Sequence, residues 1–167
     1  MSALIRLAEV DDAEAIRGIY NRAVATTNSF DLRPRSLEDQ RQWLHDRRGA
    51  YAAIVAVDSD GTTAGFASLS PYRDRPAYAT TVEDSVYVDE THQGHGLGKL
   101  LLGELLQLAG AHGFHSVIGR IVGHNEASIG LHESFGFELV GVEREVGRKF
   151  NRWLDVVIMQ RLLGGDP

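Results

Sequence analysis

The sequence contains no cysteine among its 167 residues. Without a thiol the chain can form no disulfide bond and has no sulfur nucleophile. Intracellular thiols are kept reduced, and cytoplasmic proteins rarely depend on disulfides, so this composition fits a protein of the cytoplasm. We therefore expect a cytoplasmic protein whose stability and chemistry do not depend on sulfur.

Long apolar runs and an excess of positive charge are also missing. No run approaches the roughly 20 residues that a membrane-spanning helix needs, and the start, MSALIRLAEVDDAEA, becomes polar too early for a targeting segment. Lysine and arginine number 17 against 23 acidic residues, which gives a formal net charge of −6. A phosphate backbone requires clustered basic residues. We expect neither a membrane nor a nucleic acid as partner.

Metal-site patterns are absent from the sequence as well. Its seven histidines show no HExxH spacing, and paired cysteines cannot occur. The pairs His92/His95 and His112/His115 are interpreted as surface residues. No metal is expected.

The length and the 43% share of hydrophobic residues predict a single domain over residues 1–167. Hydrophobic periodicity and turn signals predict the order β-α-α-β-β-β-α-β-α-β-β, an α/β fold with a mixed, mostly antiparallel central sheet flanked by helices. Asp11 and Asp12 are predicted to cap the first helix, Ser36 the second and Asn125 the last, while Asp60-Gly61 forms a hairpin turn. The strand over residues 80–90 should place Val82, Asp84, Val86 and Val88 on one face and Thr81, Glu83, Ser85 and Tyr87 on the other.

A glycine-rich stretch, QGHGLGKLLLGELL, joins that strand to a leucine-rich helix at residues 93–106. It fails the dinucleotide fingerprint GxGxxG, because Lys99 or Leu101 stands where the last glycine belongs. It also fails the nucleotide-hydrolase P-loop, because Gln93 and Leu100 replace the required glycine and hydroxyl residue. What remains is Q-x-x-G-x-G between a strand and a helix.

Such a loop can bind a pyrophosphate without a metal. Glycines let several backbone N–H groups turn toward one point, and the following helix adds the positive end of its dipole. The alternative is a tight turn with no ligand.

In this position Q-x-x-G-x-G resembles the coenzyme A pyrophosphate loop of the GNAT acetyltransferase superfamily. The segments TVEDSVYV, QGHGLGKLLL, NEASIGLHESFGFELVG and EVGRKFNRWLDVVIMQ resemble more narrowly its phosphinothricin and methionine sulfoximine N-acetyltransferase branch. The resemblance covers nearly the whole chain. It implies a GNAT fold and acetyl-CoA as co-substrate.

The resemblance also implies roles for individual residues. The strand backbone at Val86, Tyr87 and Val88 would guide the pantetheine arm, and Asn125 and Ser134 would lie near the same ligand. The pyrophosphate would be held by Gly94, His95, Gly96, Leu97, Gly98 and Lys99. Many relatives carry a tyrosine general acid where this chain has His132, which is the weaker candidate here.

An ammonium must lose a proton before it can attack a thioester, and a nearby carboxylate can accept that proton. The resemblance makes Glu83 the expected base; the alternative is a solvent-facing strand glutamate. Because the chain has no thiol, we expect direct transfer in a ternary complex. Arg73, Asp74 and Arg75 match the family's substrate loop, and the arginines could bind the carboxylate and a second polar group of an amino acid analogue. The alternative is a solvated surface loop.

The expected function is transfer of an acetyl group from acetyl-CoA to the primary amine of a small amino acid analogue. Two alternatives remain open: an acetyltransferase for another amine, and a non-catalytic coenzyme A sensor. Branch members are commonly homodimers, so we expect a two-fold dimer with Phe150 or Trp153, from KFNRWLD, in its interface. Otherwise both aromatic side chains would fill the core of the monomer.

Overall fold

The computed structural model describes residues 3–47 and 49–164. Its seven-stranded sheet has the order β1-β2-β3-β4-β5-β7-β6. The strands are β1 (Leu4–Leu7), β2 (Ala53–Val57), β3 (Thr63–Pro71), β4 (Thr81–Val88), β5 (Ser116–Val122), β6 (Glu138–Lys149) and β7 (Arg152–Leu162). The helices are α1 (Ala13–Val24), α2 (Leu37–Asp46), α3 (Leu97–Ala111) and α4 (Glu126–Glu133), with short 3₁₀ turns η1 (Val10–Asp12), η2 (Pro76–Tyr78) and η3 (Glu90–His92).

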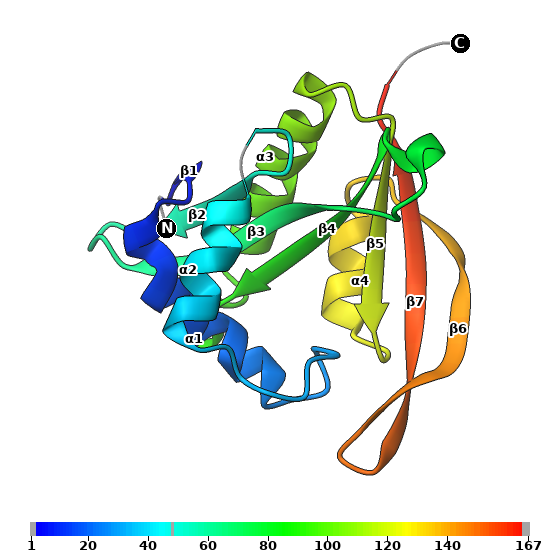
Figure 1. Ribbon diagram of the computed structural model, residues 1–167, viewed down its shortest axis with the longest axis horizontal. Coiled ribbons are helices and arrows are strands. Elements are labelled where there is room, and N and C mark those ends of the chain that lie inside the picture. The colour runs from blue at the N-terminus through cyan, green and yellow to red at the C-terminus, as the bar shows by residue number, and fades with distance from the viewer. Residues whose placement is uncertain (1–2, 48, 165–167) are drawn as a thin grey trace.

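Helices cover both faces of the sheet, and the strand residues alternate between two apolar clusters (Figure 1). Helix α3 packs with Ile54, Ala67 and Val82. Helices α1 and α2 pack on the opposite face with Val55 and Phe66. This alternation is the direct consequence of the two-residue period of a strand. The predicted α/β class and the mostly antiparallel sheet are confirmed.

The single parallel pair, β4 with β5, is short. Its register runs only from Thr81 opposite Ser116 to Asp84 opposite Gly119. Beyond that point β5 continues to pair with β7, while the end of β4 pairs only with β3. Figure 1 shows the two strands diverging, with α4 beside the opening. The end of β4 therefore has no partner strand on the β5 side, where the Val88 carbonyl accepts a hydrogen bond from the Gln93 side chain at 3.3 Å.

Several local predictions are confirmed. Ser36 accepts a hydrogen bond from the backbone of Asp39, and Asn125 accepts one from Ser128, so each caps its helix. Gly61 adopts φ 81° in the β2–β3 turn. In the part of the chain that the structure covers, no helix is both long and apolar enough to cross a membrane.

The predicted cap of α1 is correct in position only, because Asp12 occupies the N-cap without capping the helix through its side chain. Asp11 and Asp12 lie within η1, and Asp12, the residue before α1, makes no side-chain cap hydrogen bond to that helix. Instead, the buried Asp12 carboxylate accepts two hydrogen bonds from Arg6, at 2.7 and 2.9 Å, and one from the backbone of Glu9. The strand before the helix supplies a guanidinium that competes with the helix backbone for this carboxylate.

Candidate active site

The glycine-rich loop leads into α3, as its sequence predicts, and the short turn η3 separates it from β4. Gly94 and Gly96 have φ of 77° and 82°, a backbone region that residues with a Cβ rarely adopt. The backbone N–H groups of residues 94–98 find no acceptor within residues 3–47 and 49–164. Consecutive free N–H groups at the start of a 15-residue helix suit an anion such as a pyrophosphate.

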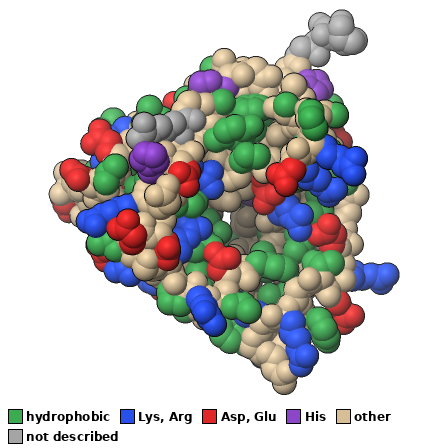
Figure 2. Space-filling view, viewed as in Figure 1, with side chains coloured by type: hydrophobic (Ala, Val, Ile, Leu, Met, Phe, Trp, Pro, Cys, Tyr) green, Lys and Arg blue, Asp and Glu red, His purple; other side chains and the backbone are tan. Residues whose placement is uncertain are grey.

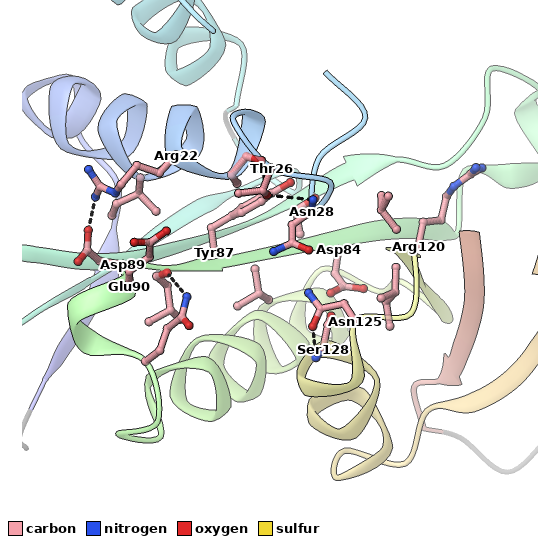
Figure 3. Close-up of a pocket in the computed structure, with 18 of the residues that line it drawn as sticks. Arg22, Thr26, Asn28, Asp84, Tyr87, Asp89, Glu90, Arg120, Asn125 and Ser128 are labelled. Carbon is pink, nitrogen blue, oxygen red and sulfur yellow. Dashed lines mark hydrogen bonds and ion pairs between the residues drawn. The ribbon is translucent and has the colours of Figure 1, made fainter. Parts of the chain in front are cut away.

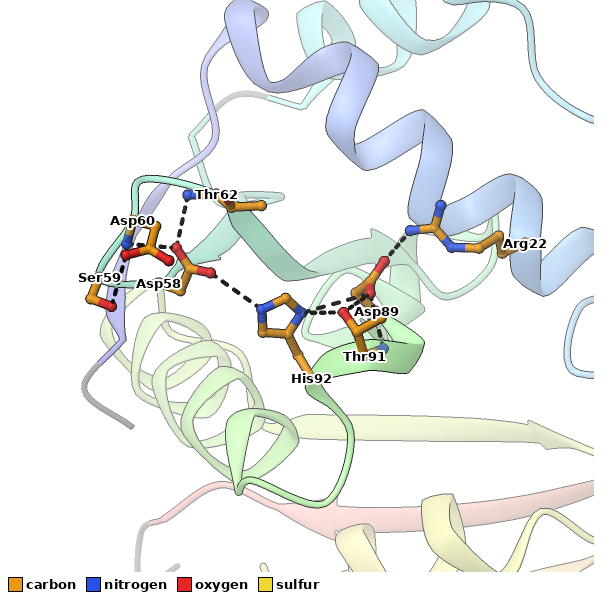
Figure 4. A network of polar contacts seen from close by, with 8 residues as sticks. All are labelled: Arg22, Asp58, Ser59, Asp60, Thr62, Asp89, Thr91 and His92. Atoms are coloured by element: carbon orange, nitrogen blue, oxygen red, sulfur yellow. Dashed lines mark hydrogen bonds and ion pairs between the residues drawn. The ribbon is translucent and has the colours of Figure 1, made fainter.

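A polar network holds the approach to this loop in place (Figure 4). Asp89 caps η3 by accepting from the backbone of Thr91, and it pairs with Arg22 of α1. His92 lies between two carboxylates, with Nε2 3.2 Å from Asp58 and Nδ1 3.6 Å from Asp89. The network joins α1, the β2–β3 turn and the end of β4. The backbone immediately before the loop is therefore held in place, although the glycines of the loop itself can adopt many backbone conformations.

A groove of about 660 Å³ runs from the loop along the end of β4 to α4. Nine residues expected to contact the co-substrate line it: Val86, Val88, Gly94, Gly96, Leu97, Gly98, Lys99, Asn125 and Ser134. The other two lie elsewhere: His95 is exposed outside the groove, and Tyr87 faces the opposite side of the sheet, where its ring stacks 5.1 Å from that of Phe66. Strand alternation places the Tyr87 side chain there.

A second cavity, of about 190 Å³, continues from the groove into the opening between β4 and β5. Figure 3 shows Asn28 and Asn125 reaching it from opposite sides, one from the α1–α2 connection and the other from the start of α4. In Figure 2 this face of the molecule is hollowed near its centre, with charged side chains around the opening. Sequence reasoning missed Thr26, Asn28, Arg120 and Ser128, because they carry no motif and meet only in the folded chain.

Glu83 lies on β4 next to Asp84, which lines this cavity, but Glu83 itself lines neither the cavity nor the groove. Its side chain is on the face of α1 and α2. It is half-buried, and no hydrogen bond to its carboxylate occurs in the described parts of the chain. Burial raises the pKa of Glu83, the charge of Arg120 opposes this rise, and Asp84 and Glu143 add to it. A carboxylate with a raised pKa is a better proton acceptor than an ordinary glutamate.

Asp84, the next residue, faces the other side of the sheet and pairs with His132 of α4. His132 Nε2 lies 3.0 Å from the Asp84 carboxylate, and its Nδ1 is 2.7 Å from the Ser128 carbonyl. Burial lowers the pKa of His132, but the hydrogen bond and charge of Asp84 outweigh it and leave the pKa raised. Because both ring nitrogens are engaged, His132 is held rigidly at the inner end of the cavity.

The loop between β3 and β4 leaves Arg73, Asp74 and Arg75 exposed. The Arg73 guanidinium lies 4.9 Å from the ring centroid of Tyr72 and 5.7 Å from that of Tyr78. Neither arginine lines the groove or the cavity. The loop connects to β4 only two residues before Glu83.

Residues at the β6–β7 turn include both exposed and buried side chains. Phe150 and Trp153 are 60% and 59% exposed, so they do not fill the core of the monomer. Lys149 is buried, and its ammonium donates hydrogen bonds to the carbonyls of Val24 and Ser29. The turn is therefore tied to the α1–α2 connection, which borders the cavity through Asn28.

Within the described residues no group of three or more histidine, aspartate or glutamate side chains is placed to hold a metal ion. The site thus combines an anion-binding loop, a groove, a cavity between diverging strands and a half-buried carboxylate. This arrangement can bind an extended phosphorylated ligand and place its far end beside a proton acceptor.

Comparisons with known proteins agree with this geometry. Residues 14–137 match the model of the acetyltransferase (GNAT) family. The chain is 43% identical to an L-methionine sulfoximine/L-methionine sulfone acetyltransferase of Pseudomonas aeruginosa, over 100% of this chain and 97% of the other. It is 42% identical to a phosphinothricin N-acetyltransferase of Streptomyces coelicolor, over 92% of each chain.

Solved structures are similar as well. The crystal structure of a GNAT superfamily phosphinothricin acetyltransferase from Sinorhizobium meliloti, in complex with acetyl-CoA, superposes with a TM-score of 0.94. It is 38% identical and covers 98% of this chain and 90% of its own.

Proposed function

The chain belongs to the GNAT family of acetyltransferases and uses acetyl-CoA as co-substrate, and from this premise we propose that its acceptor is the primary amine of a small amino acid analogue. L-Methionine sulfoximine, L-methionine sulfone and phosphinothricin are the acceptors that the names of its relatives indicate. The observation that carries the proposal is the groove, which runs from the free N–H groups of residues 94–98 to the strand opening beside Glu83.

The described residues fit acetyl-CoA. The N–H groups from Gly94 to Gly98 and the side chain of Lys99 would bind the pyrophosphate. The backbone of residues 86–88 would bind the pantetheine arm, because the end of β4 has no partner strand on the β5 side. Asn125 and Ser134 would contact the same ligand from α4.

Bound acetyl-CoA supplies the acetyl group as an activated thioester. Glu83 would accept a proton from the ammonium of the acceptor, directly or through a water, and so produce the neutral amine that attacks the acetyl carbonyl. The new amide bond replaces the bond to sulfur, and the sulfur leaves as the thiolate of coenzyme A. That thiolate, or a water, accepts the second proton that the amine nitrogen loses. With no cysteine in the chain, transfer is direct between the two bound substrates.

The surroundings of Glu83 support this role. Partial burial keeps its pKa raised, which brings its proton affinity closer to that of an amine. We also propose that Arg73 and Arg75 bind a polar group of the acceptor, because their loop leads directly into β4. We further propose a cytoplasmic homodimer that buries the exposed side chains of Phe150 and Trp153.

The test is release of free thiol from acetyl-CoA in the presence of single amines. L-Methionine sulfone, L-methionine sulfoximine and phosphinothricin should each support release, and a polyamine and a peptide N-terminus should support far less. EDTA should not change the rate, and acetyl-CoA should raise the melting temperature without added metal. Preference for the polyamine or the peptide would refute the acceptor class, and protection by acetyl-CoA without any thiol release would indicate a sensor.

A further inference from the structure

A small cleft lies on the face of the sheet opposite the groove, between β3, β4 and the helices α1 and α2. Its volume is about 90 Å³. Its lining includes Tyr20, Arg35, Trp43, Arg47, Ser85 and Tyr87, and we call the space between them the arginine cleft. A single water needs roughly 10–15 Å³ of such volume, so the cleft can hold a small polar group.

Both arginines are held in place by the protein. The backbone of Arg35 is clamped by Asn21, whose side chain accepts from its N–H at 2.8 Å and donates to its carbonyl at 3.1 Å. The Arg35 guanidinium lies 3.6 Å from the ring centroid of Tyr20. That of Arg47 lies 4.2 Å from the ring of Trp43 and donates to the Leu69 carbonyl at 2.8 Å. Guanidinium groups on aromatic rings are pre-organised to bind an anion.

Neither guanidinium is paired directly with a carboxylate, although the charge of Asp39 acts on Arg35 and that of Asp46 on Arg47. No carboxylate of residues 3–47 or 49–164 forms an ion pair with Arg35 or Arg47. Arg35 donates from Nη1 to Gln40, and the buried Nε of Arg47 has no hydrogen-bond partner in this part of the molecule. Burial and then the neighbouring charge of Arg35 lower the pKa of Arg47 to about 10. Two cations that face one cleft without an anion repel each other, and a bound anion would relieve the repulsion.

The cleft opens beside the proposed base. Ser85 and Tyr87 line it from the same face of β4 that carries Glu83. Glu83 is two residues from Ser85 along the strand, a Cα separation of roughly 7 Å. Ser85 also lines the cavity between β4 and β5, so the cleft and that cavity meet at this residue.

We propose that the arginine cleft binds the carboxylate of the acceptor and thereby selects α-amino acids over other amines. The inference rests on the proposed function and adds to it. In an α-amino acid the carboxylate and the amine are bonded to one carbon, so a carboxylate held between Arg35 and Arg47 leaves the amine on the side of Glu83. Arg73 and Arg75, on the far side of Glu83, are then free to contact the polar side-chain end of the acceptor.

The experiment compares L-methionine sulfone with its carboxamide in the unmodified enzyme and in Arg35→Gln and Arg47→Gln. Loss of a charge-assisted hydrogen bond lowers affinity about ten-fold or more. The acid-to-amide ratio of kcat/KM should therefore fall at least ten-fold in both variants, while the KM for acetyl-CoA stays unchanged. Arg41→Gln, an exposed arginine of α2, is the matched control and should keep the ratio. Arg75→Gln should keep it too.

Folding of each variant is checked by the rise in melting temperature that acetyl-CoA produces. If Arg47→Gln does not fold, the role of the cleft is tested with Arg35→Gln and with a measurement of acceptor binding to the unmodified protein. With coenzyme A in place of acetyl-CoA no acetyl group can be transferred. L-Methionine sulfone should then change the tryptophan fluorescence, to which Trp43 and the exposed Trp153 both contribute, at a concentration at least ten-fold lower than the carboxamide does.

Equal binding of acid and amide, or an unchanged ratio in Arg35→Gln, would overturn the role of the cleft. A ratio that collapses only in Arg75→Gln would overturn it as well and would assign the carboxylate to the β3–β4 loop. In either case thiol release with amino acids would leave the proposed function standing. Absence of release with every amino acid would overturn the proposed function itself.

Discussion

Gly119 of β5 faces the buried pair of Asp84 and His132, and replacing it with alanine tests that packing. A Cβ at this position would lie 2.9 Å from Cδ2 and 3.0 Å from Nε2 of His132, and 3.4 Å from the Asp84 carboxylate. The ring cannot move away freely, because Nδ1 bonds the Ser128 carbonyl and the ring lies edge-on to Phe137 with centroids 4.9 Å apart. Accommodation requires a shift of the histidine or of β5.

The expected cost follows from two contributions. Overpacking a buried site costs about 1–3 kcal/mol, and weakening a buried hydrogen bond to a charged group adds about 1–3 kcal/mol. We therefore expect Gly119→Ala to lower the free energy of unfolding by about 2–6 kcal/mol. For a chain of this size that corresponds to a melting temperature lower by roughly 4–24 °C.

Gly110→Ala is the matched control for the same chemical change. Gly110 lies in α3 with no heavy atom within 4 Å of an added Cβ. Alanine is the better helix former, so this variant should be more stable by up to about 1 kcal/mol. Both variants are measured by urea and thermal unfolding. A Gly119→Ala protein as stable as the unmodified one would refute the packing of β5 against His132.

The pH dependence of the difference in unfolding free energy between Gly119→Ala and the unmodified protein provides a second measurement. The pKa of His132 is raised above its ordinary value of 6.5 in the folded protein. Pairing with Asp84 therefore adds stability that is fully present below pH 6.5 and is lost as the pH rises through the folded-state pKa. The deficit of Gly119→Ala should be largest at the acidic end and should shrink at alkaline pH. A deficit that is independent of pH would assign the cost to overpacking alone.

The remaining predictions concern catalysis, binding and assembly. Glu83→Gln should lower kcat about 100-fold or more with the KM for acetyl-CoA nearly unchanged, whereas Glu104→Gln on the exposed face of α3 should not; equal turnover in Glu83→Gln would exclude Glu83 as the base. Because the pKa of Glu83 is raised, protonation should reduce kcat/KM on the acidic side with a midpoint above the ordinary 4.5, and this limb should be absent in Glu83→Gln. Gly96→Ala should weaken acetyl-CoA binding about ten-fold through strain at φ 82°, and Gly113→Ala, with φ 81° in the turn after the opposite end of α3, should leave binding intact. Sedimentation at micromolar concentration should show a dimer that Trp153→Ala dissociates without unfolding; a monomeric unmodified protein would refute the proposed interface.

The sequence determined the features that depend on near neighbours. Gly94, Gly96 and Gly98 lie between a strand and a helix, and the structure has the loop, the helix start and the free N–H groups in that order. Strand alternation separated Val86 and Val88 from Glu83 and Tyr87, which lie on opposite faces. These properties follow from short-range geometry, namely the two-residue period of a strand and the positive φ that glycine permits.

Local signals failed where a distant group competed for the same atoms. Asp12 has the residue type and position of a helix cap, but its carboxylate accepts hydrogen bonds from Arg6 instead of from the backbone of α1. The contact of the His132 ring with Asp84, 48 residues away, was likewise not predicted, because no local signal relates α4 to β4. Phe150 and Trp153 were ambiguous between core and surface, because an isolated aromatic residue fits either environment, and the folded chain leaves both exposed.

Only the tertiary structure assembled the arginine cleft and the cavity. Arg35 comes from the α1–α2 connection, Arg47 from the end of α2 and Ser85 from β4, and no spacing along the chain relates the three. The cavity exists because β4 and β5 pair over four residues and then diverge, a feature of the register that neither strand encodes alone. The sequence therefore determined what can bind at the glycine-rich loop, through local backbone geometry. The fold decided which charges face the base, because non-local packing alone brings these side chains together.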